Sequence, residues 1–151
     1  MQQVKLFSEG SCLSGRAGGW AYVVRCGPDI KEGAGGSSET TGCRMELEAV
    51  VQGLLALNQP CEVLVVAHST YVLNGMACLA KWKANGWTRS SRSGATLKHA
   101  DLWQQLGELS KTHTITCQRL KGHYGHEDND RCDELAAAQV ALYADAIPPR
   151  S

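Results

Sequence analysis

Near its C-terminus the chain reads KGHYGHEDNDRCDELAAA, over residues Lys121–Ala138. The first part is a glycine-hinged loop with two histidines, His123 and His126. The acids that follow are typical of a first helical turn, because carboxylates interact favourably with the positive end of a helix dipole. The alanine-rich remainder predicts a helix that continues to about Ala144, with Asp133 near its start. The stretch is either a catalytic imidazole placed before a helical carboxylate or a polar loop that caps an amphipathic helix.

Upstream of this stretch, the period of the hydrophobic pattern changes along the chain. Val4–Glu9 alternates like a strand and ends at a predicted turn, Gly10-Ser11, whereas Arg44–Asn58 repeats apolar residues at helical spacing. The predicted order is β-β-β-α-β-α-α-β-α, an α/β fold of the α+β kind with one mixed sheet flanked by helices. The other predicted strands are Gly19–Cys26, a weaker one between Ile30 and Glu39, Glu62–Ala67 and Thr112–Leu120, and the other helices are Ser69–Leu79, with Ser69 as N-cap, and Asp101–Ser110.

Length and composition indicate one domain, residues 1–145, followed by a short tail, residues 146–151. No apolar run is long enough to span a bilayer and no secretory signal is recognised, so we expect no membrane association. Seven cysteines without a Cys-x-x-Cys pair favour a reducing cytoplasm, with buried thiols expected at Cys26, Cys61 and Cys117. The formal net charge is zero, so nucleic-acid binding would need a local basic patch.

One segment, Ala80–His99, supplies such a patch, because basic residues alternate there with tryptophans and no acid is present. The alternatives are a solvated face, with the tryptophans in the core, and a surface that contacts phosphates. The candidate nucleic-acid-binding residues are Lys81, Trp82, Lys83, Trp87, Arg89, Arg92 and Lys98, together with Arg44 outside the segment.

Three carboxylates lie where a mixed sheet could bring them together: Glu9 at a strand end, Glu46 bordering the apolar face of the first helix, and Asp133 on the last helix. His68 follows the fourth strand and completes the set by position. Two Mg²⁺ ions held by converging carboxylates can hydrolyse a phosphodiester, because Mg²⁺ prefers hard oxygen ligands. Each acid could instead be a solvated strand-end or helix-dipole residue.

Four motifs make the chain similar to the bacterial type 1 ribonuclease H family over about residues 4–138. The Arg-Met-Glu-Leu and Cys-Asp-Glu-Leu-Ala motifs match at residues 44–47 and 132–136. The Asp-Gly-Ser and Asp-Ser-x-Tyr-Val motifs match except at their first residues, which are Glu9 and His68 here. The basic aromatic segment resembles the substrate-binding protrusion of that family.

The resemblance implies a monomeric endonuclease that hydrolyses the RNA strand of RNA–DNA hybrids with two Mg²⁺ or Mn²⁺ ions. The implied catalytic residues are Glu9, Glu46, His68, His123 and Asp133, with the metal ions on Glu9, Glu46 and Asp133 and a proton-transfer role for His123. No protein partner is implied. Compared with the aspartate of the family motif, the side chain of Glu9 is longer by one methylene. A misplacement of its carboxylate on the order of 1 Å can cost roughly 100-fold in rate.

His68 stands where the family motif has an aspartate, so a negative charge is lost. Its imidazole offers a nitrogen ligand that suits Mn²⁺ or Zn²⁺ better than Mg²⁺. Two alternatives therefore remain open. One is a non-enzymatic module that binds RNA–DNA hybrids or duplex nucleic acid. The other is a zinc-tolerant nuclease or phosphatase that uses His68 as a ligand.

Overall fold

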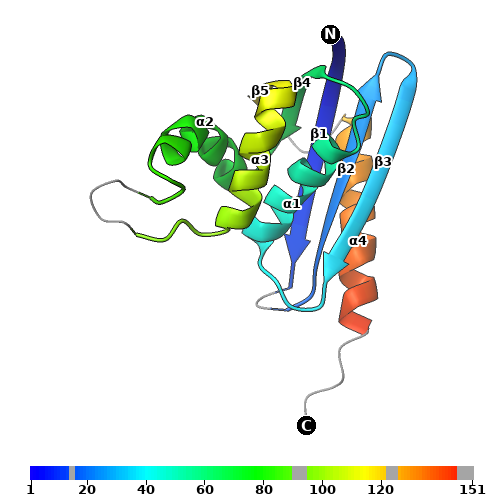
Figure 1. Cartoon of the computed structure of the whole chain (residues 1–151). Helices are drawn as coiled ribbons and strands as arrows, with labels where there is room; N and C mark the ends of the chain where they lie inside the picture. Colours follow the sequence, from blue (N-terminus) through cyan, green and yellow to red (C-terminus); the bar gives the residue numbers. More distant parts are fainter. Residues whose placement is uncertain (14–15, 90–94, 122–125, 146–151) are drawn as a thin grey trace.

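The computed structural model describes residues 1–13, 16–89, 95–121 and 126–145, which form one sheet with helices on both faces (Figure 1). The order of elements is the predicted one. The strands are β1 (Gln2–Cys12), β2 (Gly18–Cys26), β3 (Asp29–Ser37), β4 (Cys61–Ala67) and β5 (Thr114–Arg119), and the helices are α1 (Gly42–Leu55), α2 (Thr70–Ala84), α3 (Ala100–Thr112) and α4 (Glu127–Asp145).

The five strands lie in the order β3-β2-β1-β4-β5. β1, β2 and β3 pair antiparallel, as short glycine turns predict, whereas β4 runs parallel to both β1 and β5. The prediction of a five-stranded mixed sheet is therefore confirmed. Phe7 of β1 pairs with Val66 of β4 in the parallel register. Glu9 and His68, each two residues beyond one of these partners, therefore lie side by side.

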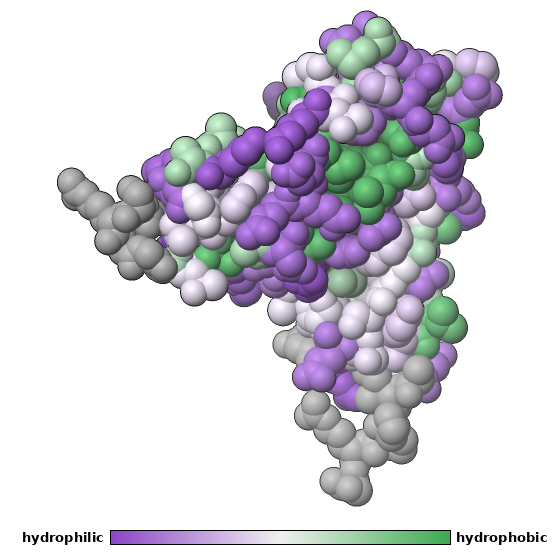
Figure 2. Space-filling view, viewed as in Figure 1, coloured by the Kyte–Doolittle hydropathy of each residue, from purple (hydrophilic) through white to green (hydrophobic). Residues whose placement is uncertain are grey.

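The main core lies between the sheet and the helices α1, α2 and α3. The apolar stripe of α1 is fully buried at Leu47, Val50, Val51 and Leu54, as its helical spacing predicts. On the surface that these helices present, Figure 2 shows mainly hydrophilic side chains, with an apolar area beside the C-terminal end of α1. None of the helices of the described residues is long and apolar enough to cross a bilayer.

The turn predicted at Gly10-Ser11 is wrong, because β1 continues through both residues to Cys12 and pairs there with the start of β2. Gly10 serves close packing instead of a chain reversal. A Cβ atom on Gly10 would lie 2.2 Å from the backbone nitrogen of Glu46. The missing side chain thus lets the N-terminal part of α1 rest directly on β1.

The helix α2 runs five residues beyond its predicted end and packs on α3 through aromatic rings. Trp103 is fully buried against Gly75 of α2, where a Cβ would lie 2.0 Å from the indole ring. The rings of Trp82 and Trp103 meet edge to face with centroids 5.1 Å apart. Trp103 is therefore a core residue, and Lys81 belongs to a helix.

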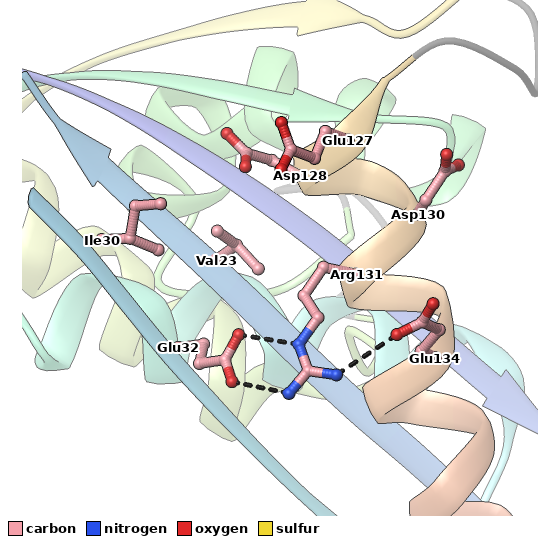
Figure 3. Close-up of a pocket in the computed structure, with 8 residues that line it drawn as sticks. All are labelled: Val23, Ile30, Glu32, Glu127, Asp128, Asp130, Arg131 and Glu134. Carbon is pink, nitrogen blue, oxygen red and sulfur yellow. Dashed lines mark hydrogen bonds and ion pairs between the residues drawn. The ribbon is translucent and has the colours of Figure 1, made fainter. Parts of the chain in front are cut away.

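On the opposite face of the sheet, α4 is held to β2 and β3 by ion pairs. Arg131 of α4 pairs with Glu32 of β3 and with Glu134 one turn along its own helix (Figure 3). Nearer the helix start, Arg25 of β2 makes a two-pronged pair with Asp128, at 2.6 and 2.8 Å. These contacts fix the helix that carries Asp133 relative to β1.

Candidate active site

Three of the predicted site residues, Glu9, Glu46 and His68, line one hollow of about 360 Å³. Glu9 comes from β1, Glu46 from the first turns of α1, and His68 from the residue after β4. The close approach at Gly10 brings α1 onto β1, and the parallel pairing of β1 with β4 places the third residue beside the first. The other residues that line the hollow are Ser8, Ser69, Thr70 and Tyr71.

Asp133 reaches the same group from the far face of the sheet. Its carboxyl group lies beside that of Glu9: the two groups repel each other when both are ionised, and a protonated Glu9 donates a hydrogen bond to Asp133. Asp133 was expected to share a face of α4 with Ala136, Ala137 and Val140. Of these, Ala136 is buried and Val140 is half-buried, whereas Ala137 and Asp133 itself are exposed. The buried face is formed by Asn129, Cys132 and Ala136 and is rotated from the predicted one, so Asp133 lies at its edge.

The carboxyl group of Glu9 is strongly perturbed. Burial raises its pKa to about 8, and the neighbouring negative charges of Asp133 and Glu46 add to the shift. One of its oxygens, Oε1, is buried without a hydrogen-bond partner among the described residues. A carboxylate cluster with these properties would be stabilised by a bound cation, because a positive charge offsets both the burial and the repulsion.

The hydroxyl of Ser69 links the helix start of α2 to Glu46. Its Oγ donates a hydrogen bond to Oε2 of Glu46 and accepts one from the backbone N–H of Val72, 3.1 Å away. The prediction of Ser69 as N-cap of α2 is confirmed. Its bond to Glu46 was missed, and position could have suggested it, because Ser69 directly follows His68 at the end of β4.

His68 lies between Glu9 and Asn129, a residue to which the sequence analysis assigned no role. Its Nε2 is 3.8 Å from Oε1 of Glu9 and 3.5 Å from Nδ2 of Asn129. Asn129 is 1% exposed, and its Oδ1 is buried with no hydrogen-bond partner in the described part of the chain. Its spacing of four residues before Asp133 is the signal that could have found it, since such residues share a helix face.

The donor atoms suit a divalent metal ion in their chemistry, because carboxylates from three elements converge and one buried oxygen lacks a partner. As they stand, no three His, Cys, Asp or Glu side chains of the described residues are grouped tightly enough to hold an ion. The bond from Ser69 draws one carboxylate oxygen of Glu46 toward α2. Ion binding would therefore require side-chain rotations within the hollow.

Of the residues predicted to bind nucleic acid, some pack on the core or pair with an acid, and others are exposed. Trp82 and Trp87 are half-buried and pack on the core, with the ring of Trp87 over Gly107. Arg44 makes a two-pronged pair with Asp101, at 2.7 and 3.2 Å, and so braces α1 against α3. The exposed cations of this set are Lys81, Lys83, Arg89 and Lys98. Arg92 lies outside the described residues, as do the predicted catalytic residue His123 and the predicted tail.

The buried thiols were predicted with mixed success. Cys61 is buried, Cys26 is half-buried, and Cys117 is exposed because β5 is an edge strand with most of its residues in solvent. Each of the seven cysteines, all within the described ranges, is a free thiol.

Comparison with known proteins gives a family model described as RNase H that matches residues 1–141. The chain belongs to the ribonuclease H family. It is 43% identical over 146 residues to the ribonuclease H of Campylobacter concisus, covering 96% of this chain and 97% of that protein.

Two solved structures share the fold. LC9-RNase H1, described as a type 1 RNase H with the type 2 active-site motif, superimposes with a TM-score of 0.80 at 24% identity, over 95% of this chain and 74% of that one. A foamy viral protease-reverse transcriptase, in complex with RNA/DNA hybrid, superimposes with a TM-score of 0.81 at 20% identity, over 93% of this chain and 20% of that one. The ribonuclease H-like fold expected from the resemblance is confirmed.

Proposed function

We propose that this ribonuclease H family member is an endonuclease that hydrolyses the RNA strand of RNA–DNA hybrids with divalent metal ions. The supporting observation is the convergence of Glu9, Glu46 and Asp133, from β1, α1 and α4, beside an open hollow. The foamy viral relative of the same fold is described in complex with RNA/DNA hybrid.

The residues of this chain would have separate tasks. Glu46, Asp133 and Glu9 would hold Mg²⁺ or Mn²⁺, which supplies an activated water and stabilises the leaving oxygen. Ser69 would orient Glu46 through its hydrogen bond. His123, which lies outside the described residues, would transfer a proton on the product side.

The substrate would be bound by the exposed cations of the basic segment, Lys81, Lys83, Arg89 and Lys98. Contacts to phosphates position a duplex without reading its sequence, and 2′-hydroxyls in the wide minor groove distinguish the RNA strand. The free thiols are compatible with a reducing cytoplasm, and we propose that the chain acts there as a monomer.

A second candidate function is a hybrid- or duplex-binding module without turnover. The placement of His68 favours it, because a neutral or positive imidazole 3.8 Å from Glu9 replaces the negative charge that the family pattern has there. Fewer negative charges weaken the binding of a divalent ion.

The two candidates are separated by cleavage of an end-labelled RNA–DNA hybrid with Mg²⁺ and with Mn²⁺. Asp133→Asn is the test variant, and Asp130→Asn, an exposed acid on the same helix, is the matched control. Cleavage by the wild type and by the control, but not by Asp133→Asn, supports the enzyme. Equal background from all three proteins, with hybrid binding intact by gel shift, supports the binding module.

A further inference from the structure

Two buried oxygen atoms on either side of His68 lack a hydrogen-bond partner among the described residues: Oε1 of Glu9 and Oδ1 of Asn129. Buried polar atoms in folded proteins are nearly always paired, so two such atoms near one imidazole indicate a shared ligand. Neither belongs to an exposed loop, since Glu9 lies in β1 and Asn129 in the first turn of α4.

The imidazole nitrogen Nε2 of His68 faces the same point. It lies 3.8 Å from Oε1 of Glu9, too far for a hydrogen bond, and 3.5 Å from the amide of Asn129. A half-turn of that amide about its terminal bond exchanges Oδ1 and Nδ2 and would present the unpaired oxygen to the imidazole. Two oxygens and one nitrogen would then converge.

The chemistry of these three atoms favours a first-row transition-metal ion over Mg²⁺. Ligands at about 2.0 to 2.2 Å from one ion lie about 3 to 3.5 Å from each other, so Glu9 and His68 would have to approach by less than about 1 Å. Mg²⁺ takes oxygen ligands, whereas first-row transition ions also accept imidazole nitrogen. The replacement of a carboxylate by His68 thus changes which ion the position accepts.

We propose that Glu9, His68 and Asn129 form a mixed nitrogen and oxygen subsite that binds a divalent transition-metal ion in preference to Mg²⁺. This inference rests on the proposed function, because the subsite is one end of the same acidic hollow. His68 is the nitrogen ligand, and Asn129 supplies the second oxygen ligand beside Glu9.

The test uses Mn²⁺ bound to the full chain, with pulsed electron paramagnetic resonance to detect a directly coordinated nitrogen. We expect nitrogen coupling in the wild type and none in His68→Asp, which restores an oxygen ligand. The control is His126→Gln, which removes a histidine that bonds to the Lys121 carbonyl instead of to the carboxylate cluster and should keep the coupling.

Competition between Mn²⁺ and Mg²⁺ gives a second readout that does not depend on turnover. His68→Asp should shift the preference toward Mg²⁺ by about tenfold, and Asn129→Ala should weaken Mn²⁺ binding by about 10- to 100-fold. If Asn129→Ala does not fold, Asn129→Asp keeps the size and an oxygen, and it should retain both Mn²⁺ binding and nitrogen coupling.

Several outcomes overturn the inference: no Mn²⁺ binding, binding without nitrogen coupling, coupling that persists in His68→Asp, or an unchanged ion preference in that variant. Hybrid cleavage without nitrogen coupling would refute the subsite and would still support the proposed function. Nitrogen coupling without any hybrid cleavage would support the subsite and would refute the proposed function.

Discussion

Replacing Gly10 by alanine should damage the site more than its size suggests. The added Cβ would lie 2.2 Å from the backbone nitrogen of Glu46, whereas ordinary contacts begin at 3.4 Å. The obstructing atoms are backbone, so α1 must move away from β1 by more than 1 Å, and Glu46 moves with it. A displacement of about 1 Å at a reacting centre can cost roughly 100-fold in rate, and overpacking costs about 1 to 3 kcal/mol of stability.

The assay is hybrid cleavage in the presence of Mn²⁺, together with urea unfolding of the same preparations. The matched control is Gly42→Ala, at the N-terminal residue of α1, where an added Cβ meets nothing within 4 Å. We expect that control to keep activity and to gain up to about 1 kcal/mol, because alanine favours helix. If Gly10→Ala matches the wild type in both rate and stability, the contact between β1 and α1 does not position Glu46 as argued.

Three further predictions concern binding, stability and pH. Lys83→Ala should weaken hybrid binding uniformly and reduce the slope of log affinity against log salt by about one, as measured by titration at several salt concentrations; an unchanged slope would place Lys83 away from the phosphates. Gly75→Ala should destabilise the fold by about 1 to 3 kcal/mol in thermal melts, because its Cβ would lie 2.0 Å from the buried ring of Trp103; an unchanged melting temperature contradicts this packing. The buried His113 accepts a hydrogen bond from the N–H of Cys61, and burial lowers its pKa below the ordinary 6.5. The unfolded chain therefore takes up this proton at a higher pH than the folded chain, so stability is complete above about pH 6.5 and falls as the pH drops toward the lower folded value. His113→Asn, which keeps an acceptor without a titrating ring, should flatten that part of the unfolding profile.

Much of the fold follows from local sequence pattern. The helical spacing of apolar residues in α1 and the N-cap at Ser69 each predict a feature that the structure contains. Such features depend on neighbouring residues, because the periods of helix and strand are set by backbone geometry. The family motifs also predicted Glu46 and Asp133 as site residues from sequence alone, and that assignment stays a prediction.

The tertiary structure decided what surrounds those carboxylates. The bond from Ser69 to Glu46, and the placement of Asn129 beside His68, join elements that are far apart in the chain. The role of Gly10 was also hidden, because a glycine that permits a turn and one that permits close packing look alike in sequence. The burial of Glu9, the charges around it and its one unpaired oxygen arise when three elements meet, so they depend on packing that no local pattern encodes.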